Sequence, residues 1–173
     1  MSGSNIEAAL KAARTLISDY KISKAPVPVE RLVRSKGISI QFAPLDGDLS
    51  GMAFVKDNIP TIGVNSLHHP NRQRFTIAHE LGHIVLHRPL IENAIHLDRG
   101  SLKRDVVSTL GIDPIEIQAN TFAAELLMPS AILERIVDGK PVDMEDDKAI
   151  ANLAKAFRVS PAAMRFRFEA SWK

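Results

Sequence analysis

The apolar residues in the first part of the chain have the spacing of helices. Apolar side chains near the N-terminus stand three or four positions apart, at Ile6, Leu10, Ala13 and Ile17. A capping box at Ser4–Glu7 accompanies them, so the pattern predicts a helix over about residues 5–18. A short second helix is expected between Pro28, which suits a first helical turn, and Gly37, which suits a helix end.

Three short strands are predicted next, followed by helices. The strand-like runs are Ile38–Phe42, Gly51–Lys56 and Pro60–Asn65, and Asp57-Asn58 favours a hairpin between the last two. Helices are expected from Pro70 to the closing Pro89, from Asp113-Pro114 to about Met128, from Pro129-Ser130 to the break at Gly139, and over Asp143–Phe157. Residues 90–112 have no clear period, which predicts a long connection or lid. This order indicates an α+β fold, with a small three-stranded sheet packed against the helix that starts at Pro70 and a helical C-terminal half.

Composition narrows the class of protein. A length of 173 residues corresponds to about one domain, so residues 1–173 are expected to form a single unit. The absence of cysteine excludes disulfides and thiolate zinc sites. The N-terminal sequence has no secretory leader and no stretch approaches the roughly 18 apolar residues of a membrane span, so a cytoplasmic protein is expected. The 22 basic and 20 acidic residues nearly balance, which by itself does not imply a nucleic-acid partner.

Residues 79–83 read His79-Glu80-Leu81-Gly82-His83 and carry the strongest chemical signal. On a helix the two histidines lie on one face, one turn apart, where their imidazoles can take adjacent corners of a tetrahedral Zn²⁺. Glu80 is then the candidate general base. A helix with surface or capping histidines is the alternative. The apolar residues around the motif favour the metal, because buried imidazoles and carboxylates are costly to desolvate unless something binds them.

A catalytic zinc site needs a third protein ligand outside this motif. Metzincins would require glycine at position 86 and histidine at position 89, but the chain has Leu86 and Pro89, which excludes that class. A glutamate from a following helix is the other common solution. Glu116 fits, because Asn120 stands one turn later and can orient a ligand histidine.

Two alternatives to this assignment stay open. Glu116 could instead complete a capping box with Asp113, and Glu125 on the same helix is a second carboxylate candidate. The metal is also open, since a His₂Glu set accepts Zn²⁺ or Mn²⁺, although the order of affinities favours zinc.

The other histidines carry weaker signals. His87 lies two turns after His79 and points in a different direction around the helix axis. It is therefore a candidate either to bond to a metal-ligating side chain or simply to end the helix. His68, His69 and His96 lie in expected loops, where a lone histidine is more often solvated than catalytic.

Two blocks of sequence resemble the ImmA/IrrE family of metallopeptidases. The first block is Arg74–His83, and the second is Glu116–Pro129, in which Ala119-Asn120, Phe122-Ala123 and Leu126-Leu127-Met128-Pro129 match. The resemblance covers about residues 5–168, and Gln118 departs from it because relatives often have a second acidic residue there. It implies a compact, minimal zincin-like metallopeptidase domain with a gluzincin-like site, in which His79, His83 and Glu116 bind the metal and Glu80 is the base.

The same resemblance implies a zinc-dependent endopeptidase that cuts a specific protein partner. Members of the family are typically phage, mobile-element or stress-response proteins that cleave a helix-turn-helix repressor, and some are paired with antitoxins. The expected substrate is therefore a repressor or an antitoxin. A catalytically silent metal-binding toxin or antitoxin component is an alternative.

The sequence does not identify the donor that stabilises negative charge on the substrate carbonyl oxygen. The candidates are His87, Arg72, Arg74, His68 and His69, whereas nothing ties Tyr20 to the site. The run Pro60–Asn65, directly before the motif helix, could present a strand edge to an extended substrate.

Residues 143–170 have features of a helix-turn-helix subdomain, which raises a DNA-binding regulatory module as a second hypothesis. Ser160 and Pro161 suit the start of a helix in which Arg165 and Arg167 could face DNA. Arg158 stands where such turns usually have glycine, and the nearly balanced charge also argues against DNA binding. A helical hairpin that closes the peptidase core is the expectation that we favour.

Overall fold

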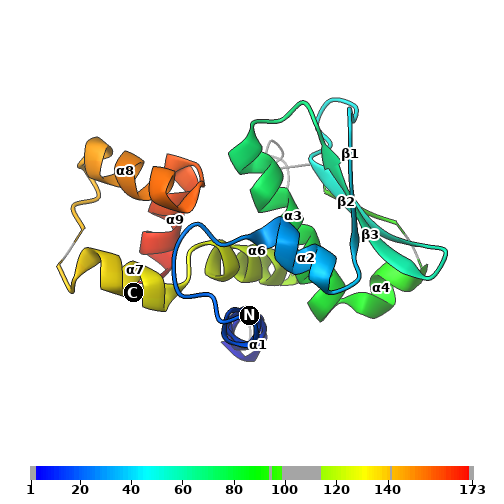
Figure 1. The fold of residues 1–173 in the computed structure, drawn as a ribbon, viewed down its shortest axis with the longest axis horizontal. Helices are drawn as coiled ribbons and strands as arrows, with labels where there is room; N and C mark the ends of the chain where they lie inside the picture. The colour runs from blue at the N-terminus through cyan, green and yellow to red at the C-terminus, as the bar shows by residue number, and fades with distance from the viewer. Residues whose placement is uncertain (1–2, 94, 99–113, 141, 172–173) are drawn as a thin grey trace.

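The computed structural model describes residues 3–93, 95–98, 114–140 and 142–171. Its helices are α1 (Gly3–Asp19), α2 (Val29–Ser35), α3 (Pro70–Leu86), α4 (Arg88–Asn93), α6 (Pro114–Leu127), α7 (Ser130–Val137), α8 (Asp147–Phe157) and α9 (Pro161–Ser171). Its strands are β1 (Ser39–Ala43), β2 (Gly51–Lys56), β3 (Ile59–Asn65) and β4 (His96–Asp98). The predicted α+β class is confirmed, with one sheet and a helical C-terminal half (Figure 1).

The sheet has four strands in the order β1-β3-β2-β4, and β1, β2 and β3 correspond to the three predicted strands. Strand β3 pairs in parallel with β1 and antiparallel with β2. The predicted hairpin joins β2 and β3, and its turn residues Asp57 and Asn58 have φ angles of 52° and 62°. Left-handed conformations at both positions match the right-handed twist of the flanking strands, and asparagine and aspartate tolerate them well.

The prediction of three strands is wrong by one, because β4 adds a fourth strand beside β2. The sequence of β4 was assigned to the connection over residues 90–112, where α4 also forms. A strand of three residues is too short to produce a visible period in the sequence. The rest of the predicted connection or lid, residues 94 and 99–112, lies outside the described residues.

The addition of β4 also changes which strands form the edges of the sheet. The run Pro60–Asn65 was expected to offer an edge to a substrate, but β3 is paired on both sides. In the described part of the chain, β1 and β4 are the outer strands.

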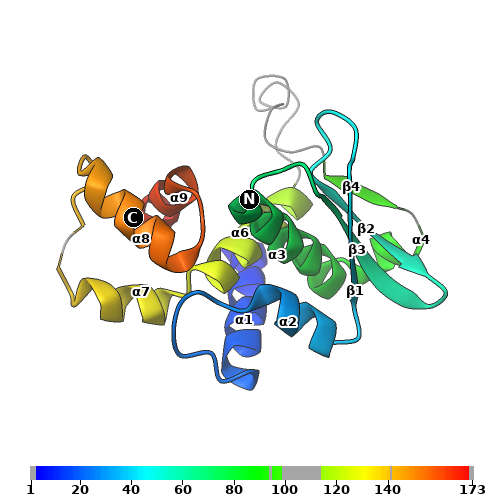
Figure 2. The same cartoon turned by 45° about the horizontal axis from the view of Figure 1, so that its top comes forward.

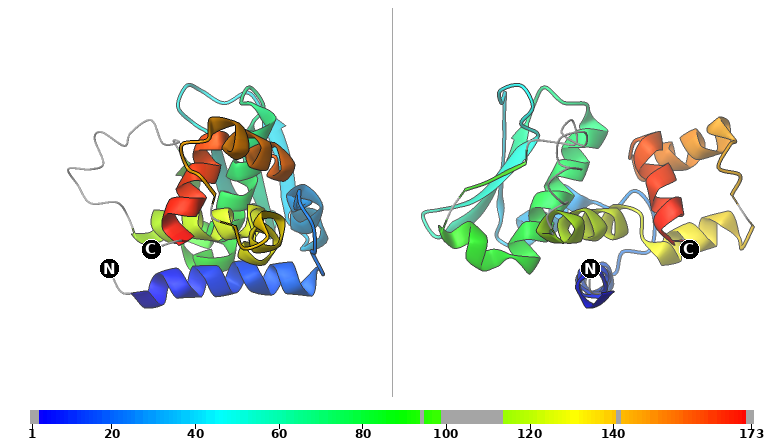
Figure 3. Two further views of the ribbon diagram at one scale, coloured as in Figure 1. Left: turned by 90° about the vertical axis from the view of Figure 1, so that its left-hand side faces the viewer. Right: turned by 180° about the vertical axis from the view of Figure 1, so that it is seen from behind.

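Helix α3 joins the sheet to the remaining helices. It contacts β2 and β3, α6 packs against it, and α1 packs across α6 (Figures 1 and 3). Apolar residues from all these elements form one core, which includes Ala13, Ile62, Ile77, Leu81, Phe122 and Leu126. No described helix has both the length and the apolar character needed to cross a bilayer.

Helices α7, α8 and α9 form a group at the end of the molecule away from the sheet (Figure 2). The helix expected from Asp143 begins at Asp147, because the Asp146 side chain accepts from the backbone N–H groups of Lys148 and Ala149 and so caps it. Ser160 caps α9 as predicted, since its hydroxyl accepts from the Ala163 N–H at 3.1 Å. Arg158, at the turn between α8 and α9, has a left-handed φ of 55°.

A buried ion pair fastens α9 to α6. Arg167 binds a carboxylate oxygen of Glu125, and its Nε donates to the Met128 carbonyl oxygen at 3.1 Å. Arg14 from α1 donates to the other Glu125 oxygen at 3.1 Å, and the Ser130 hydroxyl donates to the same carboxylate. This Glu125–Arg167 clamp connects four helices.

The clamp changes the interpretation of the C-terminal arginines. Arg167 was considered a DNA contact, but only 6% of it is exposed. Arg165, the other candidate, pairs with Asp147 and with the Met144 carbonyl oxygen. Both side chains are therefore paired within the protein in this structure.

The sheet approaches α3 most closely at Gly51. A Cβ atom at this position would lie 2.3 Å from Thr76 Cγ2 and 2.8 Å from the Gly63 carbonyl oxygen. These distances are too short for any side chain, and one of the two neighbours is backbone.

We predict that Gly51→Ala lowers the free energy of unfolding by about 1–3 kcal/mol, because overpacking here must displace strand backbone. Gly63→Ala is the matched comparison, since its Cβ would meet the Met52 side chain at 2.8 Å and methionine can move. Urea unfolding followed by circular dichroism measures both. The explanation is wrong if Gly51→Ala is as stable as the wild type or more stable than Gly63→Ala.

Candidate metal centre

Helix α3 places three residues of the motif at the junction of the sheet and α6. His79, Glu80 and His83 are 3%, 0% and 1% exposed, so the motif helix is buried in the core and is not a solvated helix. The spacing of four residues puts both imidazoles on one face, with ring centroids 4.7 Å apart and Nε2 atoms 3.0 Å apart. The two nitrogens therefore point into the same small space.

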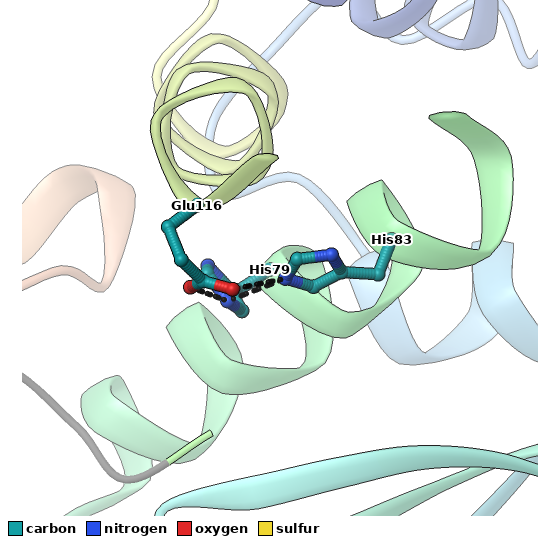
Figure 4. A group of neighbouring side chains, drawn as sticks. All are labelled: His79, His83 and Glu116. Carbon is teal, nitrogen blue, oxygen red and sulfur yellow. Dashed lines mark hydrogen bonds and ion pairs between the residues drawn. The ribbon is translucent and has the colours of Figure 1, made fainter. Parts of the chain in front are cut away.

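Glu116 reaches this space from the first turn of α6 (Figure 4). Its Oε2 lies 3.3 Å from His79 Nε2, and its Oε1 lies 3.3 Å from His83 Nε2. The structure thus brings together the three side chains that the sequence predicted as ligands. Glu125 is elsewhere, in the clamp with Arg167.

Close packing of α6 on α3 makes this meeting possible. Gly82, inside the motif, faces α6, and a Cβ there would lie 3.1 Å from Phe122 Cδ1 and 3.2 Å from Ala119 Cα. The absence of a side chain lets the two helix backbones approach. Glu116 and Asn120 lie on either side of Ala119 along α6 and are carried toward the histidines.

Asn120 binds the outer nitrogen of His79. Its Oδ1 lies 3.1 Å from His79 Nδ1. An amide oxygen only accepts, so His79 Nδ1 carries a hydrogen in this bond, and the ring is held with Nε2 directed toward His83 and Glu116. His87 ends α3, and its ring centroid is 5.5 Å from that of His83. It lies beside the cluster.

His96 is a residue of the site that the sequence did not identify. The expectation of a solvated loop histidine is wrong, because His96 belongs to β4 and its side chain is 24% exposed. Its Nε2 lies 3.0 Å from Glu116 Oε1, and its Nδ1 lies 3.3 Å from Glu80 Oε2. The ring centroids of His96 and His83 are 3.8 Å apart.

Asp98 follows on the same face of β4. A carboxylate oxygen of Asp98 lies within 4.8 Å of donor atoms of His79 and Glu80. The sequence signal that could have placed His96 and Asp98 together is the alternation His96-Leu97-Asp98, because a strand turns its first and third residues to one face.

The surroundings shift the pKa values of the ligand candidates in different directions. Burial lowers the pKa of His83 to about 4. Burial also acts to lower the pKa of His79, but the bond to Glu116 and the charge of Glu80 raise it overall. Burial opposes ionisation of Glu116, yet hydrogen bonds from the imidazoles hold its pKa far below the usual range. At neutral pH His83 is therefore neutral and Glu116 ionised, the forms that bind a metal ion.

The pKa values of Glu80 and His96 are shifted by the contact between these two side chains as well as by burial. Burial raises the pKa of Glu80, although the hydrogen bond with His96 favours its ionised form. Burial acts to lower the pKa of His96, but hydrogen bonds to Glu116 and Glu80 raise it to about 10. The described structure gives the other Glu80 oxygen, Oε1, no hydrogen-bond partner, although it is buried.

The spacing of the donor atoms suits a small divalent cation. Zinc bonds of about 2.0–2.1 Å in a tetrahedral arrangement separate ligand atoms by roughly 3.3 Å. The three separations among His79 Nε2, His83 Nε2 and the Glu116 oxygens are 3.0, 3.3 and 3.3 Å. Two imidazoles and a carboxylate also match the ligand preferences of zinc. These residues could therefore hold the ion without a change of fold.

Comparison with known proteins agrees with this geometry. Residues 33–169 match the model of a peptidase family described as the IrrE N-terminal-like domain. The chain belongs to this family. The resemblance to ImmA/IrrE metallopeptidases that the two sequence blocks suggested is thereby confirmed.

Individual relatives of this IrrE-like chain are considerably longer. It is 31% identical over 129 residues to the radiation response metalloprotease IrrE of Deinococcus radiodurans, an alignment that covers 73% of the chain and 35% of the relative. A solved structure titled Mycobacterium tuberculosis transcriptional regulator superposes with a TM-score of 0.59 and 19% identity, covering 91% of this chain and 45% of that one. The second likeness shows the fold alone.

Proposed function

We propose that this protein is a zinc-dependent endopeptidase that hydrolyses a peptide bond in a specific protein partner. One observation carries the proposal: two imidazoles from α3 and a carboxylate from α6 converge at 3.0–3.3 Å in a member of a metallopeptidase family. His79, His83 and Glu116 are the proposed ligands. Zinc is preferred to Mn²⁺ because the order of affinities favours it at such a site.

Glu80 is the proposed general base. Zn²⁺, when bound, supplies a Lewis acid that makes a water nucleophilic near neutral pH and polarises the substrate carbonyl. Glu80 follows His79 on α3 and has one buried oxygen without a protein partner, so that oxygen can accept the proton of the attacking water. The carboxyl group then delivers this proton to the leaving amine, which returns Glu80 to its starting state.

The proposed substrate is a helix-turn-helix repressor or an antitoxin, as the family resemblance implies, and the proposed location is the cytoplasm. The β4 edge supports a protein substrate, because β4 borders the site and an extended segment can pair with an outer strand. Its first and third residues, His96 and Asp98, would then lie beside the bound segment.

The proposed base is tested with Glu80→Gln. Glutamine keeps the shape of the side chain but is not a base at this pH, so we expect unchanged zinc content and a loss of cleavage of about 10²–10⁴-fold. The zinc content of each purified protein is measured by elemental mass spectrometry. Cleavage is measured on candidate repressors encoded beside this chain, with the cut mapped by peptide mass.

The matched control is Glu92→Gln, the same substitution at an exposed residue of α4 that pairs with Arg88. It should retain full activity. A Glu80→Gln protein that still cleaves would exclude Glu80 as the base. A wild type that binds zinc and cleaves no candidate partner would favour the catalytically silent alternative.

Asn120 is tested through zinc affinity. Asn120→Ala removes the acceptor for His79 Nδ1, so we expect zinc affinity to fall by about 10–100-fold. Asn120→Asp keeps an acceptor and should remain close to the wild type. Asn71→Ala is the control, because Asn71 bonds to the Val159 carbonyl oxygen at the other end of α3. Competition with a chromophoric chelator measures all three, and equal affinities for wild type and Asn120→Ala would contradict the assignment.

A further inference from the structure

Three of the five side chains that the sequence offered as donors to the substrate carbonyl oxygen, Arg72, Arg74 and His69, form hydrogen bonds elsewhere. Arg72 donates to the Ser50 hydroxyl at 2.8 Å, and Arg74 is buried and donates to the Val27 carbonyl oxygen at 2.8 Å. His69 caps α3, since its Nδ1 accepts from the Asn71 N–H at 3.2 Å. These hydrogen bonds of Arg72, Arg74 and His69 involve no residue of the histidine and glutamate cluster.

His96 does contact it, from strand β4. Its Nε2 is one hydrogen-bond length, 3.0 Å, from the oxygen of Glu116 that also faces His83. An ionised carboxylate only accepts hydrogen bonds, so this nitrogen carries a hydrogen and is a donor. The N–H group therefore points into the space beside the proposed ligands.

The position of His96 differs from that of a fourth ligand. The described donor groups whose atoms lie within 4.8 Å of one another are His79–His83–Glu116 and His79–Glu80–Asp98, and His96 is in neither. Its side chain is 24% exposed, whereas those of His79 and His83 are 4% and 1% exposed. The Glu116 side chain is 35% exposed, so His96 and Glu116 together form the solvent-accessible side of the cluster.

The backbone of β4 holds the imidazole in this place. Strand β4 pairs with β2 over three residues, with His96 opposite Ala53, and the Ser50 N–H donates to the Asp98 carbonyl oxygen at 2.8 Å. Leu97 points to the other face and is 45% exposed. Because the strand is part of the sheet that packs on α3, the donor is fixed relative to Glu80 before substrate binds.

We propose that His96 is a further catalytic residue, whose Nε2–H binds the carbonyl oxygen of the scissile peptide as negative charge develops on it. This proposal rests on the proposed endopeptidase function. In the absence of substrate the N–H is satisfied by Glu116. A carbonyl oxygen that arrives beside Glu116 takes over this hydrogen bond, which strengthens as the oxygen becomes an anion.

The test compares His96→Ala, His96→Gln and the control Leu97→Ala in the full zinc-loaded chain. For the mapped repressor substrate, His96→Ala should lower kcat by about 10²–10³-fold and leave KM within about threefold, since the bond forms mainly in the transition state. Glutamine also has an N–H at Nε2 and should recover part of kcat. Leu97→Ala removes a side chain from the same strand and should match the wild type.

Two binding measurements accompany the kinetics. A phosphinic peptide that spans the cut site carries a tetrahedral anion, so calorimetry should show His96→Ala weakening it by a factor similar to the loss in kcat. Zinc affinity should stay within about threefold of the wild type, because a donor to the substrate is not a ligand.

The outcomes separate the two proposals. A His96→Ala protein that keeps its kcat or its phosphinate affinity overturns the role of His96 alone. A fall of tenfold or more in zinc affinity also overturns it, because His96 would then bind the metal or hold Glu116. A wild type that neither binds zinc nor cleaves removes the endopeptidase function, and the role of His96 with it.

Discussion

The burial of charged and polar groups inside α3 is the constraint on which the rest of this structure depends. His79, Glu80 and His83 are almost entirely removed from water, and such groups lose several kcal/mol of solvation unless other groups replace the water. The hydrogen-bond partners that replace water have to come from several elements, because α3 itself can contact only one side of each of these side chains. The elements around α3 are arranged to supply these partners.

Each neighbouring element contributes something different to that environment. Helix α6 brings a carboxylate and an amide oxygen, Glu116 and Asn120, to two sides of the His79 ring. Strand β4 brings an imidazole, His96, that lies between Glu80 and Glu116. The clamp of Arg167 on Glu125 holds the far end of α6 against the C-terminal helices.

Sequence reasoning succeeded where the relevant spacing lies within one helix. The four-residue separations of His79 from His83 and of Glu116 from Asn120 are fixed by the helical repeat, and the structure brings these residues together as expected. The helices of the C-terminal half and the hairpin were predictable for the same reason, because caps, prolines and turn residues act locally.

The contacts that sequence reasoning missed join distant elements through tertiary packing. His96 reaches Glu116 from a three-residue strand, and Arg167 reaches Glu125 across 42 positions. Neither contact produces a periodic pattern in the sequence, and the residues that form them are of types that are common on protein surfaces. The edge position of β4 depends on how β2 and β3 pair, so it could not be read from the run Pro60–Asn65 alone.

Gly82 has a consequence for how such proteins are recognised in sequence collections. A search pattern treats the two middle positions of the motif as free, yet the second of them here sets the distance between α3 and α6. A bulky residue at position 82 would meet Phe122 and the backbone of Ala119 and so force α6, which carries Glu116, away from α3. A chain could then match the five-residue pattern and still lack a third ligand within reach, so the size of this one side chain separates a complete site from an incomplete one.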